Sequence, residues 1–306
     1  MFIVKYRKIF FTLSVILIGL SFYGIFKFGF KESIDFKGGS ITEIRYEGER
    51  PSKEIVDTEI RALDLGGFSV RPSGGDRFII RTQELSEVNK NTLLNKLSNN
   101  GKEKITVERS NTIGPVAGSE LRDKAMKAIL VVILMIVFFV TFAFRKVSKP
   151  VSSWKYGLAT VVALAHDIII PVGVFVFLGH FYGTEMDLLF VTGLLAILGY
   201  SVHDSIVVFD RVRENLRLNM EDNKKEDFDK TVGASLTQTF GRSINTSLTI
   251  FITLLALYLF GGPTTKDFAL LLIIGVVIGT YSSIFVASPL LVTFQQWQKT
   301  PLNKAN

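Results

Sequence analysis

Six apolar runs, each close to the ~20 residues that a helix needs to cross a bilayer, divide the 306-residue sequence. Lipid offers no hydrogen-bond partners to an irregular backbone, so runs of this kind are helical when they enter a membrane. We therefore expect a membrane all-α bundle of six transmembrane helices. The runs are Ile9–Phe26, Ala125–Phe144, Tyr156–Phe181, Met186–Phe209, Ile244–Phe260 and Phe268–Phe294.

The first apolar run follows three basic residues, and no small-x-small cleavage site closes it. We interpret residues 1–30 as a retained first transmembrane helix rather than a removed signal peptide.

Basic residues gather at one end of the predicted helices. At the other end, the two short loops 179–185 and 261–267 contain a single lysine or arginine, Lys266. The positive-inside rule then places both termini, including a tail at 297–306, in the cytoplasm. The basic residues assigned to that side are Lys5, Arg7, Lys8, Arg145, Lys146, Lys149, Lys155, Arg211, Arg213, Arg217, Lys224, Lys225, Lys230, Arg242, Lys299 and Lys304.

The composition combines 48% hydrophobic with 21% charged residues, which indicates membrane helices plus an aqueous domain. The net charge of +7 lies beside the apolar runs, so we attribute it to topology and expect no nucleic-acid partner. The sequence has no cysteine, which excludes disulfides and thiolate metal sites. We expect no cofactor and no metal site.

One long segment, residues 31–123, has the composition of a soluble domain. Alternating and helical patterns in it predict the order β-α-β-β-α-β, which is that of a ferredoxin-like α+β domain on the extracytoplasmic side. Its predicted strands are Ser40–Tyr46, Phe68–Pro72, Phe78–Thr82 and Ile105–Arg109, and its predicted helices are Ser52–Leu63 and Glu87–Leu97.

The remaining residues, 124–296, hold five of the six helices. A hydrophilic cytoplasmic loop at about 211–241 interrupts them, with charges of both signs in near balance. This pattern is typical of either an amphipathic helix pair or a solvated loop.

Asp204 lies inside the fourth apolar run. A carboxylate there costs roughly 3 kcal/mol on insertion scales, so it is a candidate functional residue that needs a partner. Helical spacing puts Tyr200, Ala196 and Gly193 on the same face, whereas His203 points about 100° away and is assigned to packing.

The third run contains His166 and Asp167. A short loop joins it to the fourth run, so the two helices are expected to be antiparallel neighbours with Asp167 and Asp204 about 8 Å apart in depth. Two carboxylates this close in an apolar medium do not both ionise cheaply. We therefore predict a proton relay through these residues, although His166 and Asp167 are also compatible with a helix contact.

The fifth run begins with Arg242, the candidate counter-charge of Asp204. Asn245 and Thr246, at i+3 and i+4, continue a polar path into the membrane, to which Tyr200 also belongs. The alternative is that Arg242 is a topology anchor at a helix end.

The sixth run carries small residues at intervals of four, which favours close helix packing rather than conduction. They are Gly275, Gly279, Ser283 and Ala287. His180 falls in an outer loop and is expected to be inert.

Enzyme motifs are missing from the sequence. It has no P-loop, no H-E-x-x-H pattern and no G-x-S-x-G elbow, so neither an ATPase nor a hydrolase is expected.

Several motifs in the same order resemble the SecF family of the bacterial Sec protein-export machinery, which forms the SecDF complex. The resemblance covers essentially the whole chain. The motifs are Asp35–Ser40, Gly114-Pro115, Gly118 with Glu120-Leu121, Ala165–Asp167, Gly199–Asn215, Arg242–Thr246 and Gly279–Pro289.

This resemblance implies a six-helix unit that corresponds to one half of an RND-like transporter. It implies that this half pairs with SecD in the bacterial inner membrane, beside the Sec translocon channel. It implies that Asp204 and Arg242 take part in proton-driven export, and that the outer domain engages unfolded preprotein. His203 is a departure, because the family more often has Asn at that position.

Two other functions stay open: a non-catalytic scaffold or assembly subunit of the translocon, and one half of an RND-type exporter. Carboxylates and hydroxyls alone do not separate proton from sodium coupling.

Overall fold

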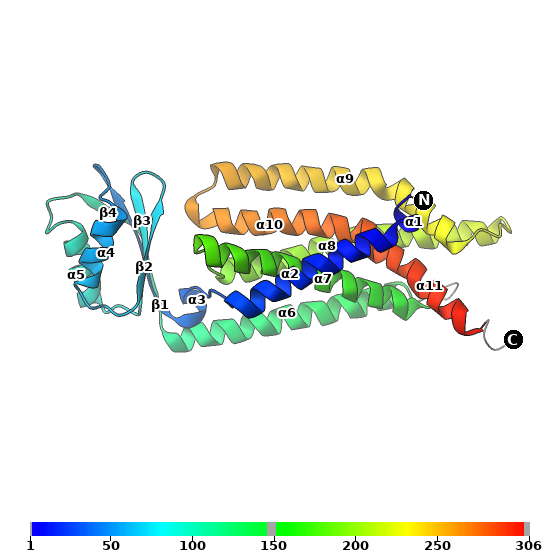
Figure 1. Cartoon of the computed structure of the whole chain (residues 1–306), viewed down its shortest axis with the longest axis horizontal. Helices are drawn as coiled ribbons and strands as arrows, with labels where there is room; N and C mark the ends of the chain where they lie inside the picture. The colour runs from blue at the N-terminus through cyan, green and yellow to red at the C-terminus, as the bar shows by residue number, and fades with distance from the viewer. Residues whose placement is uncertain (1, 146–150, 303–306) are drawn as a thin grey trace. The chain divides into compact units, whose positions relative to one another are not determined.

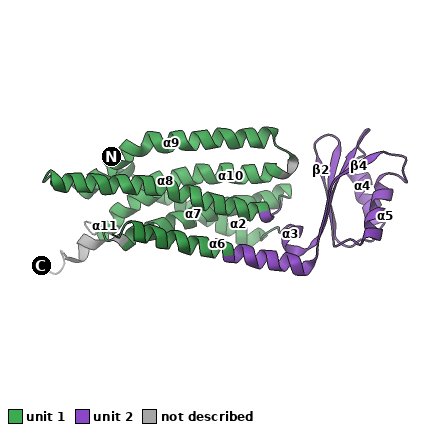
Figure 2. Cartoon of the chain, turned by 180° about the vertical axis from the view of Figure 1, so that it is seen from behind, with its two compact units in different colours: residues 1–31, 128–184, 189–306 green, residues 32–127, 185–188 purple. Residues whose placement is uncertain are grey.

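The computed structural model describes residues 2–145 and 151–302, and of the basic residues discussed above Lys146, Lys149 and Lys304 lie outside this part. Two compact units are distinguished in Figure 2. Unit 1 comprises residues 1–31, 128–184 and 189–306, and unit 2 comprises residues 32–127 and 185–188. Each unit is described by itself.

The described residues contain six helices that are long and apolar enough to cross a membrane, as the sequence predicts. Figure 1 shows the helices of unit 1 running side by side as a bundle. A short helix α1 (Phe2–Lys5) precedes the first of them, and the sixth is continuous through α10, a π-helical turn η1 and α11. Their bounds are α2 (Arg7–Phe28), α6 (Pro115–Ala143), α7 (Ser153–Tyr182), α8 (Leu188–Glu221), α9 (Phe228–Phe260), α10 (Pro263–Ser282), η1 (Ser283–Ala287) and α11 (Ser288–Leu302).

The hydrophilic stretch 211–241 is mostly helical. Helix α8 continues to Glu221 and α9 begins at Phe228, so only residues 222–227 separate them. The two helices are tied by a hydrogen bond of 2.8 Å from Asn215 Nδ2 to Ser235 Oγ. Of the two alternatives for this stretch, the structure has the helix pair.

The core of unit 1 is apolar and partly aromatic. The rings of Phe144 and Tyr156 stack at 5.3 Å, and Phe209 of α8 meets both rings edge-on. All three side chains are fully buried, which joins α7 and α8 to the end of α6.

Small residues let α8 and α10 approach closely. A Cβ atom added to Gly275 would collide with Ile197, and one added to Gly193 would lie 2.6 Å from Leu271 Cδ2. At Gly279 the same atom would be 3.4 Å from Ser201 Cβ, an ordinary contact. The four small residues of the sixth span are all buried within this chain.

Unit 2 contains a four-stranded antiparallel sheet in the order β2-β3-β1-β4. Helices α4 and α5 bury Val56, Ile60, Leu93 and Leu97 in the same core as Ile44, Phe78 and Ile80 of the strands. The bounds are α3 (Ile34–Lys37), β1 (Gly39–Tyr46), α4 (Lys53–Arg61), β2 (Phe68–Ser73), β3 (Arg77–Thr82), α5 (Glu87–Leu97) and β4 (Ile105–Ile113).

The predicted elements of this unit agree with the observed ones to within a few residues, except that β4 runs on to Ile113 instead of ending at Arg109. The longer strand pairs with β1 along its whole length, from Gly39 opposite Ile113 to Tyr46 opposite Ile105. Cross-strand pairing therefore extends a strand whose sequence loses its apolar alternation.

The Asp35–Ser40 motif forms a tight junction in unit 2. Gly38 has a φ of 77° and Gly39 a φ of 136°, values that favour glycine. A Cβ atom on Gly38 would lie 2.7 Å from Pro115 Cα, so the backbone of 114–118 packs directly on this turn.

Residues 185–188 complete unit 2 through three contacts. The backbone N–H of Leu188 donates to Asp35 Oδ2 at 3.0 Å, and Ser33 N–H donates to the carbonyl of Met186 at 2.9 Å. Arg81 pairs with Glu185 at 3.0 Å. Because α8 begins at Leu188, the carboxylate of Asp35 accepts a backbone N–H of the first turn of the helix that carries Asp204.

Alkaline pH is expected to destabilise unit 2 through Tyr46. Its hydroxyl donates to the carbonyl of Leu97 at 3.1 Å, and burial, with Glu103 and Glu59 nearby, raises its pKa above the usual 10.0. Because the folded pKa exceeds the unfolded one, this stabilisation is complete below about pH 10 and is lost as the pH rises further.

We expect the stability of the wild type to fall more steeply above about pH 10 than that of Tyr46→Phe, which itself loses about 1 kcal/mol at neutral pH. Urea unfolding of the full chain in detergent at a series of pH values measures this. Equal slopes for the two proteins above about pH 10 would contradict the prediction.

Gly275→Ala is expected to destabilise the bundle by about 1–3 kcal/mol, because the new methyl group overlaps Ile197. Gly279→Ala is the matched control and should be close to neutral. Ile197→Val combined with Gly275→Ala should restore part of the loss. Thermal unfolding in detergent checks the order, and equal effects of the two alanines would contradict it.

Candidate functional site

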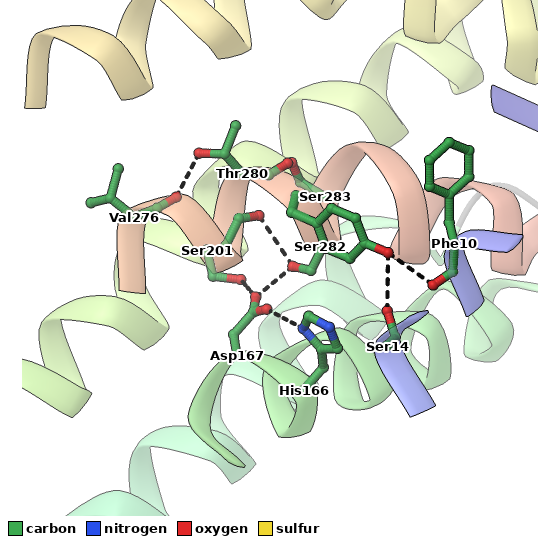
Figure 3. A network of polar contacts seen from close by, with 11 residues as sticks. Phe10, Ser14, His166, Asp167, Ser201, Val276, Thr280, Ser282 and Ser283 are labelled. Carbon is green, nitrogen blue, oxygen red and sulfur yellow. Dashed lines mark hydrogen bonds and ion pairs between the residues drawn. The ribbon is translucent and has the colours of Figure 1, made fainter. Parts of the chain in front are cut away.

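Asp167 is fully buried on α7 and three side chains surround it (Figure 3). His166 Nδ1 lies 2.8 Å from Oδ1, and Ser282 Oγ of α10 donates to Oδ2 at 2.6 Å. Ser201 Oγ of α8 also donates to Oδ2. The carboxylate therefore joins three helices, and its oxygens accept bonds from neutral hydroxyls and an imidazole.

Asp204 is buried on α8 in a second cluster. Ser243 Oγ of α9 donates to Oδ1 at 2.7 Å, and Ser283 Oγ of the π-helical turn donates to Oδ2. In the described part of the chain Asp204 makes no ion pair. Its described hydrogen-bond partners are both hydroxyl groups.

The two carboxylates are close in depth. Ser201, which binds Asp167, lies three residues before Asp204 on α8, which corresponds to about 4.5 Å along the helix. Ser282 and Ser283 are adjacent, yet they bind Asp167 and Asp204 respectively. The junction of α10 and η1 thus reaches both acidic groups.

Hydroxyl groups extend the second cluster along α9 and α10. Ser247 Oγ lies 2.6 Å from Thr280 Oγ1 and 2.5 Å from the hydroxyl of Tyr200. Ser247 also donates to the backbone carbonyl of Ser243 at 2.7 Å, the residue whose hydroxyl donates to Asp204. Tyr200, which the sequence places on the polar path, is therefore part of this chain of hydroxyls.

The other polar residues of α9 lie elsewhere. Arg242, Asn245 and Thr246 are exposed on a different face of α9 from Ser243 and Ser247. The structure does not bring Arg242 to Asp204, so the expected counter-charge contact is not made within this chain. The physical reason is the 100° step between neighbours on a helix: when Ser243 faces α8, Arg242 does not.

Two of the three histidines, His203 and His180, lie apart from both clusters, whereas His166 belongs to the Asp167 cluster. His203 is exposed on α8, and the ring of His180 stacks on Phe28 with centroids 4.0 Å apart. His166 is buried, its ring lies parallel to that of Tyr281 at 5.9 Å, and its Nε2 has no hydrogen-bond partner among the described residues.

Four serines bind the carboxylates, and the sequence patterns predict none of them as part of the proton relay. The pattern of the sixth run predicts helix packing for Ser283 and indicates no role for Ser201, Ser243 or Ser282. The spacing of Ser201 from Asp204 at i+3, and of Ser243 from Ser247 at i+4, was a visible signal. It does not decide which polar stripe of α9 faces inward.

Chemically, these clusters suit the binding and release of a proton. A carboxylate accepts hydrogen bonds when ionised and donates one when protonated, and a serine hydroxyl can serve either form. Groups of three or more His, Asp or Glu side chains that would hold a metal ion are absent from the described ranges.

Comparison with protein families gives two matches. Residues 92–297 match "Protein export membrane protein SecD/SecF, C-terminal", and residues 23–49 match "SecD/SecF GG Motif". The second range contains the Asp35–Ser40 turn. The first contains both carboxylates and every hydroxyl that binds them.

Known SecF relatives are similar over most of their length. "Protein translocase subunit SecF" of Thermobaculum terrenum is 39% identical, with 96% of this chain and 93% of the relative covered. The SecF subunit of Anaerolinea thermophila is 35% identical, with 95% and 94% covered. A "Protein translocase subunit SecDF" of Thermus thermophilus is 36% identical over 94% of this chain but only 37% of that protein.

A solved structure is similar in fold as well. The crystal structure of SecDF from Thermus matches with a TM-score of 0.81 at 34% identity and covers 96% of this chain. This chain spans 38% of that longer chain.

Asp167→Ala is expected to lower the stability of the bundle by about 3 kcal/mol, because it leaves Ser201, Ser282 and His166 without their buried acceptor. Asp167→Asn keeps one acceptor oxygen and should lose less. Thermal unfolding in detergent measures both. If Asp167→Ala were as stable as the wild type, the three bonds would contribute nothing to the fold.

Proposed function

The chain belongs to the SecD/SecF family of protein-export membrane proteins, and from this we propose that it is an accessory subunit of the Sec preprotein translocase that, with SecD, uses the proton motive force to promote late steps of protein export. One observation carries the proton-driven part. Two buried carboxylates, Asp167 and Asp204, lie close in depth on neighbouring helices, and among the described residues they are bound by hydroxyls and one imidazole.

Such a pair is a proton relay. An ionised carboxylate in an apolar bundle is costly, so protons are bound and released there as the surroundings change. One charge that crosses 100 mV yields about 2.3 kcal/mol, which is enough to bias a domain motion. In this relay Asp204 and Asp167 hold the proton, and His166 accepts it beside Asp167.

The surface that a partner protein would cover carries Arg242, Asn245 and Thr246. These polar groups sit on an exposed face of α9, where lipid would not solvate them. A second, SecD-like half that covers this face would bring Arg242 into the acidic network as its counter-charge and close the polar path. The SecDF name of the longer Thermus chain supports such a half.

Unit 2 is the part that faces the emerging preprotein. Its order β2-β3-β1-β4, with one helix after β1 and one after β3, supports a ferredoxin-like fold. We assign unit 2 to the extracytoplasmic side of the bacterial inner membrane, next to the translocon channel. Both termini of the chain are assigned to the cytoplasm. Unfolded preprotein is its substrate.

Export in membrane vesicles, with and without an imposed pH gradient, tests the proposal. Asp204→Asn should insert and assemble with SecD but lose the part of export that depends on the gradient. Asp210→Asn is the matched control, because Asp210 is an exposed carboxylate on the same helix that pairs with Arg213 at 2.8 Å. It should export like the wild type.

Gradient-stimulated export by Asp204→Asn at the wild-type level would overturn the proposal. The chain would then act as a scaffold that holds SecD and the translocon together.

A further inference from the structure

Ser282 and Ser283 occupy a position that packing alone does not explain. They are adjacent in sequence, both are fully buried, and each hydroxyl lies within hydrogen-bond distance of a different carboxylate. Ser282 ends α10 and Ser283 begins the π-helical turn η1. Turns of this kind are rare and often occur at functional sites.

Each of the two hydroxyls has a second acceptor on its own helix. Ser282 Oγ lies 2.6 Å from Asp167 Oδ2 and 3.1 Å from the carbonyl of Gly279. Ser283 Oγ lies beside Asp204 Oδ2 and 3.0 Å from the carbonyl of Thr280. In both cases the second acceptor is the backbone three residues earlier.

A serine hydroxyl has one proton to donate, so its two acceptors compete. An ionised carboxylate is the stronger acceptor, since charge-assisted hydrogen bonds are roughly twice as strong as neutral ones. When the carboxyl binds a proton, it donates its own O–H to the serine oxygen. The serine O–H then donates to the backbone carbonyl, and the serine stays in contact with the carboxyl with donor and acceptor exchanged.

Bonds from serine to a backbone carbonyl compete with the ladder of the helix and tend to bend it. Here they act where the backbone changes from α to π geometry. The carbonyl of Gly279 also accepts the N–H of Ser283, so it is shared between the helix and the hydroxyl of Ser282.

We propose that Ser282 and Ser283 are positioning residues that convert protonation of Asp167 and Asp204 into a change of backbone hydrogen bonding at the α10–η1 junction. This inference rests on the proposed proton-driven function. The groups that face the pair are His166 and Ser201 at Asp167, with Tyr281 against the His166 ring, and Ser243 at Asp204.

Infrared difference spectra, acid minus neutral, of the full chain in lipid vesicles test the proposal. Asp167→Asn and Asp204→Asn identify the carboxylic C=O bands of the two groups. In the wild type a change in the backbone amide band should accompany them. Ser282→Ala should remove the part that follows Asp167, and Ser283→Ala the part that follows Asp204.

Two variants separate this role from simple packing. Ser283→Thr keeps a hydroxyl and should keep the amide change. Ser288→Ala removes a buried hydroxyl of the same span that donates to the carbonyl of Ser283 at 3.2 Å and touches no carboxylate. It should leave both the carboxyl and the amide signals as in the wild type.

A second measurement follows the backbone directly. The chain has no cysteine, so spin labels at Val277→Cys and Trp297→Cys, both exposed, report the distance across the π-helical turn without background. The distance should differ between acid and neutral pH in the wild-type background. In the Ser282→Ala/Ser283→Ala double variant this difference should be lost.

The outcomes distinguish failure of the serine role from failure of the proton-driven function. If carboxylic bands appear but the amide and distance changes persist in the double variant, the role of the serines is wrong and the proton-driven function stands. If no carboxylic band depends on Asp167 or Asp204, both proposals are wrong.

Discussion

Two carboxylates, Asp167 and Asp204, are buried inside an apolar helical bundle. Each requires hydrogen-bond donors, because unpaired charge in this setting is strongly unfavourable. Helices α7, α8, α9 and the sixth span provide them as serine hydroxyls together with His166. The small residues between α8 and α10 follow from the same requirement, because short side chains reach a carboxylate only when the helices approach closely.

Hydroxyls rather than cations suit a site that changes its charge. A lysine or arginine held inside the bundle would fix a carboxylate in its ionised form, whereas a serine hydroxyl can donate to the ionised form and accept from the protonated one. Arg242 stays on the outside of α9 in this chain, so its charge would enter the network from a surface that a partner helix covers. The proposed function then divides the site between this chain and a second half.

Helix α8 belongs to both compact units of the chain. The start of α8 is bound by Asp35, and residues 185–188 belong to the compact unit that contains the sheet. The first residue of α8, Leu188, is part of unit 2, and Asp204 of the same helix is part of unit 1. The helix therefore connects the two units covalently. Glycines 38 and 39 allow the tight turn on which this junction depends.

Much of this follows from the sequence. The length of the apolar runs predicts the spans, and the cost of a carboxylate in lipid marks Asp204 as the candidate acid. Alternation in residues 31–123 predicts the strands. These features depend on local composition and period alone. Tertiary structure alone decided which stripe of α9 faces inward, that Ser282 and Ser283 reach different carboxylates, and that Arg242 does not meet Asp204 within the chain. The reason is that neighbours on a helix point about 100° apart, so only the positions of the packed helices choose between faces that the sequence offers equally.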